Sequence, residues 1–400
     1  MPWGSEMRVL DGIRIVDFTR HMAGPFATLV LADHGADVIK VESLEGDSSR
    51  TGGADKLGDQ SALFLLWNRG KRSLSIDMRT AEGKALVLDL IREADVLVEN
   101  YRPGVADRIG IGYAAMAELN PRLVYCSVSA FGPQAALRDA PGTDPVVQAT
   151  SGIVSLTGER GRDGVLVGAP IADFTGAMYA VQAILLALLA RERTGRGQHV
   201  EVPMLFGVLS MLTTRLGTYW ASGEDPERFG SAHAVHVPYG AYRTADGQAM
   251  AGTYGGESWP KFARAIGLPE LLEDPRFATG ALRREHRDAL AAIIEPVFAQ
   301  RTTEDWRARF AAEGALFAPV LTLSEILSHP QVEEAGLVQT LQHPTAGAIP
   351  QIGPPISMSE TPPAIDRHPP LLGEHTDEVL REAGCDDATI ARLRAAGVVR

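Results

Sequence analysis

Short β-type apolar runs alternate with helical patterns through the first third of the chain. Each run is rich in Val, Ile and Leu, which is typical of a strand buried inside a sheet. The strand-like runs are Ile13–Phe18, Ala36–Glu42, Ser73–Met78, Ala94–Asn100 and Leu123–Ala130, and the helical patterns include Ala27–Asp33 and Thr80–Glu93. Strands that alternate with helices in this way predict an α/β fold with a doubly wound parallel sheet.

The carboxyl ends of the predicted strands are the expected place for a ligand. In open parallel sheets, ligands bind where the strands end and the loops begin. This rule selects the segments Phe18–Gly24, Glu42–Ser43 and Asn100–Gly104. Basic residues lie near two strand ends, in NRGKRS (Asn68–Ser73) and NYRPGVADRIG (Asn100–Gly110). Each stretch could be a solvated basic face, or the two could together form an anion pocket.

The later part of the chain predicts a second, smaller domain. A strongly apolar helical pattern runs from Thr175 to about Ala190, and a second one covers Leu205–Tyr219. After a loop rich in Gly, Pro and His, the sequence predicts short strands near Ala241–Thr244 and Ala249–Gly252, and helices at Trp259–Ile266, Arg283–Ala299 and Thr303–Ala312. We therefore expect a large α/β domain at 1–220, a small α+β domain at 221–342, and a Pro-rich arm with a C-terminal helix at 343–400.

Composition narrows the class of protein. Hydrophobic residues make up 45% and charged residues 22% of the 400, a balance typical of a globular protein and not of a disordered chain. The formal net charge is -12 at pH 7, which argues against a nucleic-acid partner. Cys126 and Cys385 lie far apart in sequence, so no disulfide framework is expected and a reducing, cytoplasmic compartment is indicated.

No membrane partner is expected either. The longest apolar stretch, Ala177–Ala190, is shorter than the roughly 20 residues that a bilayer span requires. The N-terminal segment MPWGSEMRVLDG contains acidic residues and no apolar run, which does not fit a secretory signal. These features predict a soluble protein.

Most standard catalytic strings are missing from the sequence. There is no GxSxG nucleophile elbow, no HExxH zinc motif and no phosphate-binding GxxxxGK[ST] loop. A GxGxxA match at Gly110–Ala115 is separated from the preceding strand, whereas a dinucleotide loop adjoins its strand. The nearest histidine pair, His233 and His236, lies in a loop without metal-ligand spacing, so no metal site is expected.

Asp173, in GAPIADFTGAMYA (Gly168–Ala180), is the candidate catalytic residue. An Asp at the start of a helix is most often an N-cap that accepts backbone N–H bonds. The alternative is a carboxylate nucleophile beside glycines that let a substrate approach closely. A helix beginning near Thr175 would favour the ionised carboxylate through its dipole, and backbone N–H groups near Gly168 or Gly176 could stabilise an oxyanion.

Taken together, several segments resemble family III CoA-transferases, the CaiB/BaiF family that contains formyl-CoA transferase, carnitine CoA-transferase and α-methylacyl-CoA racemase. The matching stretches occur in order along nearly the whole chain. They are LDGIRIVDFTRHMAGPFATLVLADHGADVIKVE, KRSLSIDMRTAEGK, DVLVENYRPGVADRIG, NPRLVYCSVSAFG, GTDPVVQATSG, VGAPIADFTGAMYA, RTGRGQHVEVPM and LLGEHTDEVL.

This resemblance implies a Rossmann-like large domain built from both chain ends, and an interlocked homodimer. It implies acyl-CoA and a carboxylic acid acceptor as substrates, with coenzyme A as co-substrate and no tightly bound cofactor. Asp173 falls on the catalytic aspartate of the family. The positions that fall on CoA contacts are His21, Met22, Ala23, Ile76, Arg79, Asn100, Tyr101 and Arg108.

The function that this resemblance implies is an acyl-CoA:carboxylate CoA-transferase of the EC 2.8.3 type. Asp173 would form an acyl-aspartyl anhydride and then an aspartyl-CoA thioester. The alternative is an acyl-CoA racemase or epimerase, but Thr143 stands where the racemase branch carries its catalytic histidine, so a second base is missing. A CoA-binding protein without turnover is a third interpretation, which an intact Asp173 disfavours. Arg supplies most of the basic residues and makes dicarboxylates candidate substrates.

Overall fold

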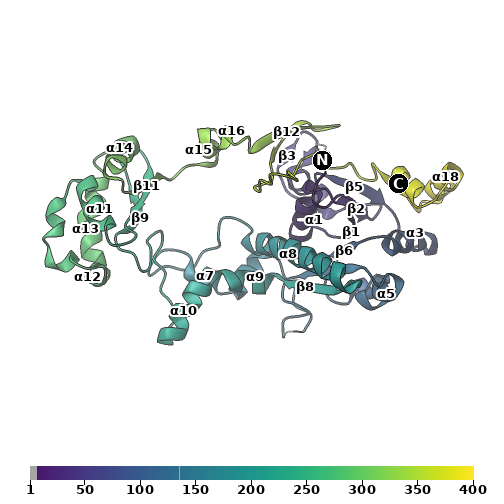
Figure 1. The fold of residues 1–400 in the computed structure, drawn as a ribbon, viewed down its shortest axis with the longest axis horizontal. Helices are drawn as coiled ribbons and strands as arrows, with labels where there is room; N and C mark the ends of the chain where they lie inside the picture. Colours follow the sequence, from purple (N-terminus) through teal and green to yellow (C-terminus); the bar gives the residue numbers. More distant parts are fainter. Residues whose placement is uncertain (1–6, 135) are drawn as a thin grey trace. The chain divides into compact units, whose positions relative to one another are not determined.

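The computed structural model describes residues 7–134 and 136–400, so the first six residues of the N-terminal segment considered above lie outside the described part. The chain divides into two compact units (Figure 1). The larger unit takes the chain up to Ile153, then Leu166–Gly217 and Gln331–Arg400. The smaller unit takes Val154–Val165 and Thr218–Pro330. Residues 154–165 and 218–220, which the sequence analysis assigned to the large domain, thus group with the smaller unit, and residues 331–342, assigned to the small domain, group with the larger unit.

A six-stranded parallel sheet forms the centre of the larger unit. Its strands are β1 (Arg14–Asp17), β2 (Asp37–Glu42), β5 (Lys71–Ser75), β6 (Val96–Glu99), β7 (Val124–Ser129) and β8 (His199–Pro203). Their order is β5-β2-β1-β6-β7-β8, and every neighbouring pair is parallel. The prediction of an α/β fold with a parallel sheet is confirmed. The chain proceeds outward from β1 to β5 and then continues on the other side of β1, so the order reverses between β1 and β6.

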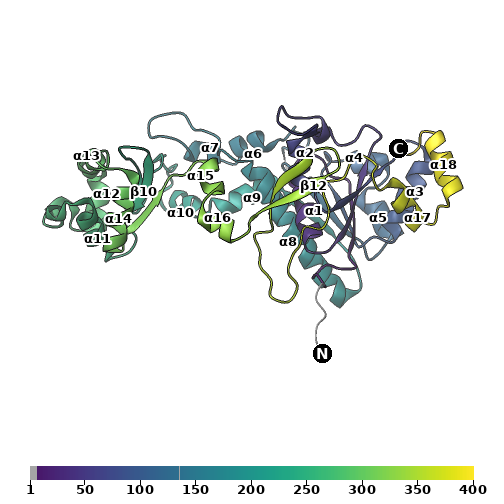
Figure 2. The ribbon, with the colours of Figure 1, turned by 90° about the horizontal axis from the view of Figure 1, so that it is seen from above.

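Helices cover the sheet because successive strand residues point to opposite faces. One core joins Val16, Ile39 and Leu97 to side chains of α3 (Ala81–Arg92) and of the C-terminal helices α17 (Thr376–Glu382) and α18 (Asp387–Ala395). Figures 1 and 2 show α18 close to α3 at the end of the unit. On the sheet, α1 (Ala23–Asp33) packs with α8 (Ile171–Thr194), and both helices contact sheet strands.

The long helix α8 differs from its prediction in length. It begins at Ile171, four residues before the predicted start, and its 24 residues reach Thr194. By length and composition it is the one helix of the described residues that could cross a membrane. Its buried residues instead pack against α1, β7 and β8, which is the position of a core helix in a globular domain. The second predicted helical stretch is divided at Leu212 into α9 (Met204–Met211) and α10 (Thr213–Ser222).

Shorter elements complete the larger unit. They are α2 (Ala62–Trp67), α4 (Val105–Ile109), α5 (Tyr113–Leu119), α6 (Asp144–Thr150), α16 (Pro330–Glu334), the 3₁₀ turn η1 (Ser48–Arg50), and the hairpins β3 (Lys56–Leu57) with β4 (Gln60–Ser61) and β12 (Val338–His343) with β13 (Gly347–Ile352). Helix α7 (Ile153–Leu156) lies at the boundary between the units.

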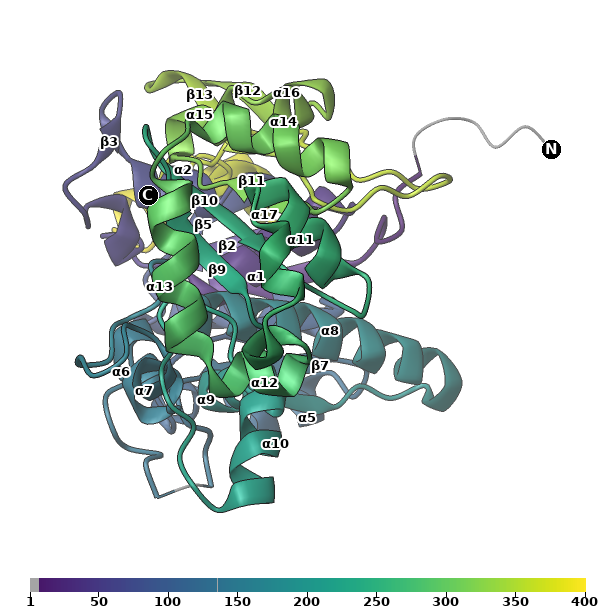
Figure 3. The same cartoon turned by 90° about the vertical axis from the view of Figure 1, so that its left-hand side faces the viewer.

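The smaller unit is an antiparallel sheet packed with helices, which Figure 3 shows facing the viewer. Its core is strongly aromatic, because the side chains of Phe262, Phe298, Trp306 and Phe310 are fully buried against one another. Its strands are β9 (Tyr239–Arg243), β10 (Gln248–Gly252) and β11 (Leu316–Pro319), and its helices are α11 (Ser258–Ile266), α12 (Gly280–Glu285), α13 (Arg287–Phe298), α14 (Thr303–Glu313), α15 (Leu323–Leu327) and the 3₁₀ turns η2 (Pro269–Leu272) and η3 (Pro275–Phe277).

Arg72 ties the C-terminal helix α17 to the sheet. Its guanidinium is buried and lies 2.6 Å from Asp37, 2.9 Å from Glu378 and 2.7 Å from Glu382. A planar guanidinium can serve several carboxylates at once, so one side chain joins β2, β5 and α17. The backbone adds to this joint, since the N–H of His375 donates to the carbonyl of Ser73 at 3.0 Å.

Arg72→Ala should therefore release the C-terminal arm from the sheet. The three carboxylates are 36–49% exposed, so losing the guanidinium should cost about 2 kcal/mol of the free energy of unfolding, less than for a fully buried pair. Urea denaturation measures that loss, and limited proteolysis should cut the Pro-rich segment before α17 faster than in the wild type. Arg381→Ala is the matched control, because Arg381 is an exposed arginine of the same helix whose partner, Asp387, is also exposed. Equal effects of the two substitutions would contradict this role for Arg72.

Candidate active site

A cavity of about 460 Å³ opens beyond the carboxyl ends of the sheet strands, in the larger unit. Its walls come from the loops that follow β1, β6, β7 and β8, and from the first turn of α8. Because the strand order reverses between β1 and β6, their loops diverge and leave room for a ligand. The wall residues used below are His21, Ala23, Asn100, Tyr101, Arg102, Arg138, Thr143, Asp144, Asp173 and Met204.

Asp173 lies in the first turn of α8 and lines this cavity. Pro170, not Asp173, occupies the N-cap position, so the N-cap interpretation of Asp173 is wrong. Among the described residues, no donor forms a hydrogen bond with its carboxylate. Burial, and secondly the negative charge of Asp144, raise its pKa to about 6. The expected contribution of the helix dipole therefore does not set the balance at this carboxyl, where burial and a like charge raise the pKa.

Asp144 performs the capping that the sequence suggested for Asp173. One carboxylate oxygen accepts from the backbone N–H of Ala172 at 2.7 Å and from that of Asp173 at 3.2 Å. The other oxygen accepts from the Gln148 side-chain amide at 2.6 Å. The Gln148 carbonyl oxygen in turn accepts from the backbone N–H of Val167 at 2.9 Å. This network fixes the chain before α8 and hence the position of Asp173.

The sequence contained only an ambiguous signal for this role. Asp144 precedes Pro145 at the start of α6, which is a pattern of local helix initiation. Its side chain instead reaches the start of α8, 29 residues away along the chain. Such a contact depends on how α6 and α8 pack together, so spacing alone could not reveal it.

Asn100 and His21 meet at the loop after β1. The Asn100 amide oxygen accepts from the backbone N–H of Arg20 at 2.9 Å, and its NH₂ group donates to the Arg20 carbonyl at 2.8 Å. His21, next in the chain, has a φ of 65° and is the one non-glycine residue of the described chain with a positive φ. Asn100 thus uses both ends of its amide to hold the loop, and His21 extends from that loop into the cavity wall.

The cavity contains Asp173 and four of the other eight predicted site residues, namely His21, Ala23, Asn100 and Tyr101. The remaining four lie elsewhere. Met22 is the buried N-cap residue of α1. Ile76 is buried in the core and pairs with Val399. Arg79 is exposed and forms an ion pair with Asp77 at 2.8 Å, and Arg108 is an exposed residue of α4.

Two cationic side chains of the cavity wall were missed by the sequence analysis. Arg102 follows β6, and Arg138 lies in the loop after β7. Arg138 has a side chain that is 52% exposed, and it forms a loose ion pair with Asp139 at 3.5 Å. The surplus of arginine over lysine in the composition was the available signal, but it does not indicate positions. Within the described residues, no group of three or more His, Cys, Asp or Glu side chains is placed to hold a metal ion.

Comparisons of the sequence and of the structure with known proteins point to the same family. Residues 10–376 match the model of the family described as CoA-transferase family III. The human succinyl-CoA:glutarate CoA-transferase is 34% identical over 99% of this chain and 91% of its own. The succinyl-CoA:mesaconate CoA-transferase of Haloarcula hispanica is 33% identical over 96% of this chain and 98% of its own. The crystal structure of a CAIB/BAIF family protein from Brucella suis superimposes with a TM-score of 0.84 and 37% identity, covering 94% of this chain and 99% of that chain.

The raised pKa of Asp173 predicts that ionisation of this carboxyl lowers the free energy of unfolding, to an extent that depends on pH. The folded-state pKa of about 6 exceeds the usual value of 3.8, so folding favours the protonated form. The stability that this proton confers is complete below about pH 4 and is lost as the pH rises through 6. Asp173→Asn should therefore raise the free energy of unfolding at pH 7.5 by at most about 3 kcal/mol, and should give no gain at pH 4.

Urea denaturation at the two pH values measures this difference. Asp144→Asn is the matched variant, since it keeps an oxygen acceptor for the N–H groups of α8 and removes the neighbouring charge. It should lower the pKa of Asp173, but no gain in the free energy of unfolding at pH 7.5 is expected, because its NH₂ group faces the Gln148 NH₂ group from which Asp144 accepts. A gain from Asp173→Asn that is the same at pH 4 and pH 7.5 would show that the pKa is not raised.

Proposed function

This chain belongs to CoA-transferase family III, and from that premise we propose that its transfer of CoA from an acyl-CoA to a carboxylate proceeds through Asp173 as the nucleophile. The observation that carries the proposal is the position of Asp173, whose carboxylate lines the cavity without a hydrogen-bond donor among the described residues. A carboxylate that is partly dehydrated and unbonded is a stronger nucleophile than one held by donors.

The reaction divides into four acyl-transfer steps, and none of them takes up or releases a proton overall. The ionised Asp173 attacks the thioester carbonyl of the donor, the C–S bond breaks, and CoA thiolate leaves an acyl-aspartyl anhydride. The thiolate then attacks the aspartyl carbonyl, which releases the donor carboxylate and forms an aspartyl-CoA thioester. The acceptor carboxylate attacks that thioester to give a new anhydride and thiolate. Attack of the thiolate on the acceptor carbonyl produces the new acyl-CoA and restores Asp173.

The site provides two conditions that this sequence needs. A pKa of about 6 leaves Asp173 ionised at neutral pH while keeping it more basic than an ordinary carboxylate. The cap from Asp144 fixes the backbone of Asp173, so attack occurs from a held geometry. Gly176 is an unsuitable oxyanion donor, because it lies inside α8, where its N–H donates to the helix backbone. Glycine is needed there for a different reason, since a side chain would collide with Met204. Exposed Gly168 remains a candidate.

We infer that the substrates are dicarboxylic acids and their CoA thioesters. The human relative is named for succinyl-CoA and glutarate, and the Haloarcula relative for succinyl-CoA and mesaconate. Glutarate and mesaconate are dicarboxylates, and succinyl-CoA is the CoA monothioester of a dicarboxylic acid. In this chain, Arg102 and Arg138 line the same cavity as Asp173. A guanidinium can bind the second carboxylate through charge-assisted hydrogen bonds while the first reacts.

The proposal also includes a homodimer, interlocked as the family resemblance implies, and a cytoplasmic location. Helices α8 and α9 expose a row of large apolar side chains, of which Leu186 is 59% and Phe206 55% exposed. Exposed apolar side chains of this kind favour burial against a partner, and a second copy of the chain would bury them.

The free thiols of Cys126 and Cys385 support a reducing compartment. CoA acts as a co-substrate, and the proposal needs no tightly bound cofactor or metal.

Asp173→Ala should lower the rate of CoA transfer by at least about 10⁴-fold, because the covalent route is lost. Incubation of the wild-type protein with a panel of acyl-CoAs, followed by intact-mass measurement and peptide mapping, should locate an acyl or CoA adduct on Asp173. Asp387→Ala, at an exposed aspartate outside the cavity, is the control and should still form the adduct. Retained turnover in Asp173→Ala would remove the residue from the mechanism, and α-proton exchange with solvent deuterium without an adduct would favour the racemase alternative.

Dicarboxylate acceptors should be used better than monocarboxylates of equal length. We expect kcat/KM for glutarate to exceed that for valerate by roughly 10- to 100-fold, the value of a hydrogen bond to a charged group. Arg138→Met or Arg102→Met, whichever arginine binds the distal carboxylate, should abolish this preference while leaving valerate turnover unchanged. Equal use of glutarate and valerate by the wild-type enzyme would contradict the assigned substrate class.

A further inference from the structure

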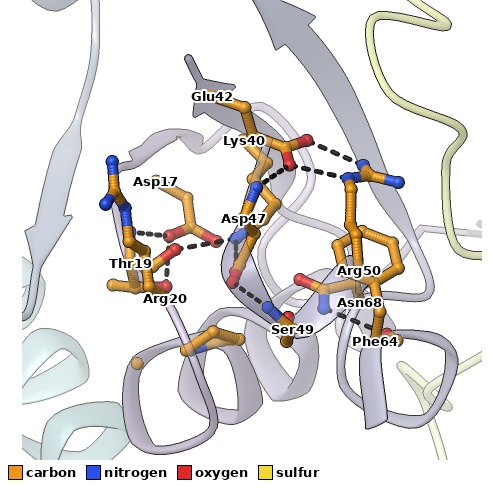
Figure 4. A network of polar contacts seen from close by, with 12 residues as sticks. Asp17, Thr19, Arg20, Lys40, Glu42, Asp47, Ser49, Arg50, Phe64 and Asn68 are labelled. Atoms are coloured by element: carbon orange, nitrogen blue, oxygen red, sulfur yellow. Dashed lines mark hydrogen bonds and ion pairs between the residues drawn. The ribbon is translucent and has the colours of Figure 1, made fainter. Parts of the chain in front are cut away.

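A cluster of buried charges lies directly beneath the loop that follows β1 (Figure 4). We call residues Thr19–Met22 the β1 loop. Lys40 on β2 and Lys71 on β5 point into the interior with side chains that are 1% and 0% exposed. Each is paired with a buried carboxylate, Lys40 with Asp47 at 2.9 Å and Lys71 with Asp17 at 3.1 Å. Buried ammonium groups are rare, because removing a charge from water costs free energy. Two of them in one cluster therefore suggest a function.

The Lys40 ammonium makes one contact that Lys71 does not make. Its Nζ donates to the backbone carbonyl of Thr19 at 2.7 Å, at the start of the β1 loop. Lys71 donates to the carbonyl of Pro25, inside α1, at 2.9 Å, and to the Asn68 side chain at 2.9 Å. In Figure 4, Lys40 lies between Asp17, Thr19 and Asp47. The two lysines thus share burial and charge and differ in the segment that they hold.

The β1 loop is held on its other sides as well. The Thr19 N–H donates to the Asp17 carboxylate at 2.8 Å, and the Thr19 hydroxyl donates to the same oxygen. Asn100 fixes both the N–H and the carbonyl of Arg20, as described above. Next to these fixed points, His21 adopts a left-handed φ of 65°, which a non-glycine residue keeps only where its surroundings impose it.

We propose that Lys40 is a positioning residue for the CoA thioester, which holds the β1 loop from below in the conformation that lines the cavity. The inference rests on the proposed function, because it takes the cavity of His21 and Asp173 to be the thioester site. Lys40 itself is buried and touches no ligand. Its ammonium supplies a donor to Thr19 that no neutral side chain of similar length would supply, and Asp47 with Asp17 balances its charge.

The benefit to binding is entropic. A loop that is already ordered does not lose conformational freedom when the ligand arrives, so more of the contact energy appears as affinity. Without Lys40, the Thr19 carbonyl loses its buried donor and the strained conformation of His21 loses support. The loss should therefore appear in KM for the acyl-CoA, whereas kcat should change little, because Asp173 and its cap from Asp144 belong to α8 and α6.

The test compares Lys40→Met with Arg69→Met. Arg69 is another buried cation of this unit, and it contacts Gln351 and Asp33, which lies at the end of α1 opposite the β1 loop. Lys40→Met should raise KM for the acyl-CoA at least 10-fold with kcat within threefold, and should speed amide hydrogen exchange at Thr19 and Arg20. Arg69→Met should lower the thermal midpoint by a similar amount and leave this KM within threefold. Since Lys40→Met leaves Asp47 unpaired, the double variant Lys40→Met/Asp47→Asn repeats the test without that charge and covers failure of the single variant to fold.

Two outcomes would overturn the proposal. One is an equal rise of KM in the Lys40 and Arg69 variants, which would indicate general destabilisation. The other is fast exchange of the Thr19 and Arg20 amides in the ligand-free wild-type protein, which would show that the loop is not held. Calorimetric binding of CoA to Asp173→Ala separates this proposal from the assigned chemistry. Intact CoA binding with retained turnover would reject Asp173 as nucleophile and leave the test of Lys40 valid.

Discussion

The reversal of strand order between β1 and β6 is the constraint on which the site depends. On one side of this point the chain continues to β2 and β5, and on the other to β7 and β8. The loops after β1 and β6 therefore leave the sheet in different directions, and a cavity opens between them. Asn100, the first residue after β6, bonds to both polar groups of the Arg20 peptide in the loop after β1. Because β1 and β6 are neighbouring strands, the loops that follow them start side by side, and Asn100 joins them at the base of the cavity.

Aspartates in this unit differ in chemistry because their surroundings differ. Burial acts to raise the pKa of Asp17 and Asp47, but neighbouring lysines and hydrogen bonds outweigh it and hold both values below the usual range. Asp173 has no such partner among residues 7–134 and 136–400, and burial together with the charge of Asp144 raises its pKa to about 6. Paired carboxylates hold loops and strands in place, while the unpaired one remains available for reaction. One residue type thereby supplies both the supporting network and the proposed nucleophile.

Support for the site extends to distant parts of the chain. The C-terminal helices return to the sheet through Arg72 and through a core shared with α3. Beneath the cavity, Lys40 and Lys71 connect β2 and β5 to the first loop and to α1. The cavity wall is therefore fixed from below by charges and from the side by Asn100, and the first turn of α8 is fixed by Asp144. An active site that is held in this way loses little freedom on binding its substrate.

The sequence by itself determined the alternation of strands and helices, the parallel α/β class, the family and the candidate Asp173, because these depend on local periodicity and on ordered motifs. The tertiary structure decided which carboxylate caps α8, since Asp144 acts across 29 residues, and that Asn100 holds a loop 80 residues away. It also separated Ile76, Arg79 and Arg108 from the cavity and placed Arg102 and Arg138 in its wall. Periodicity reports which face of an element is buried, whereas the partners of a buried polar group are set by how distant elements pack, and a linear pattern does not contain that information.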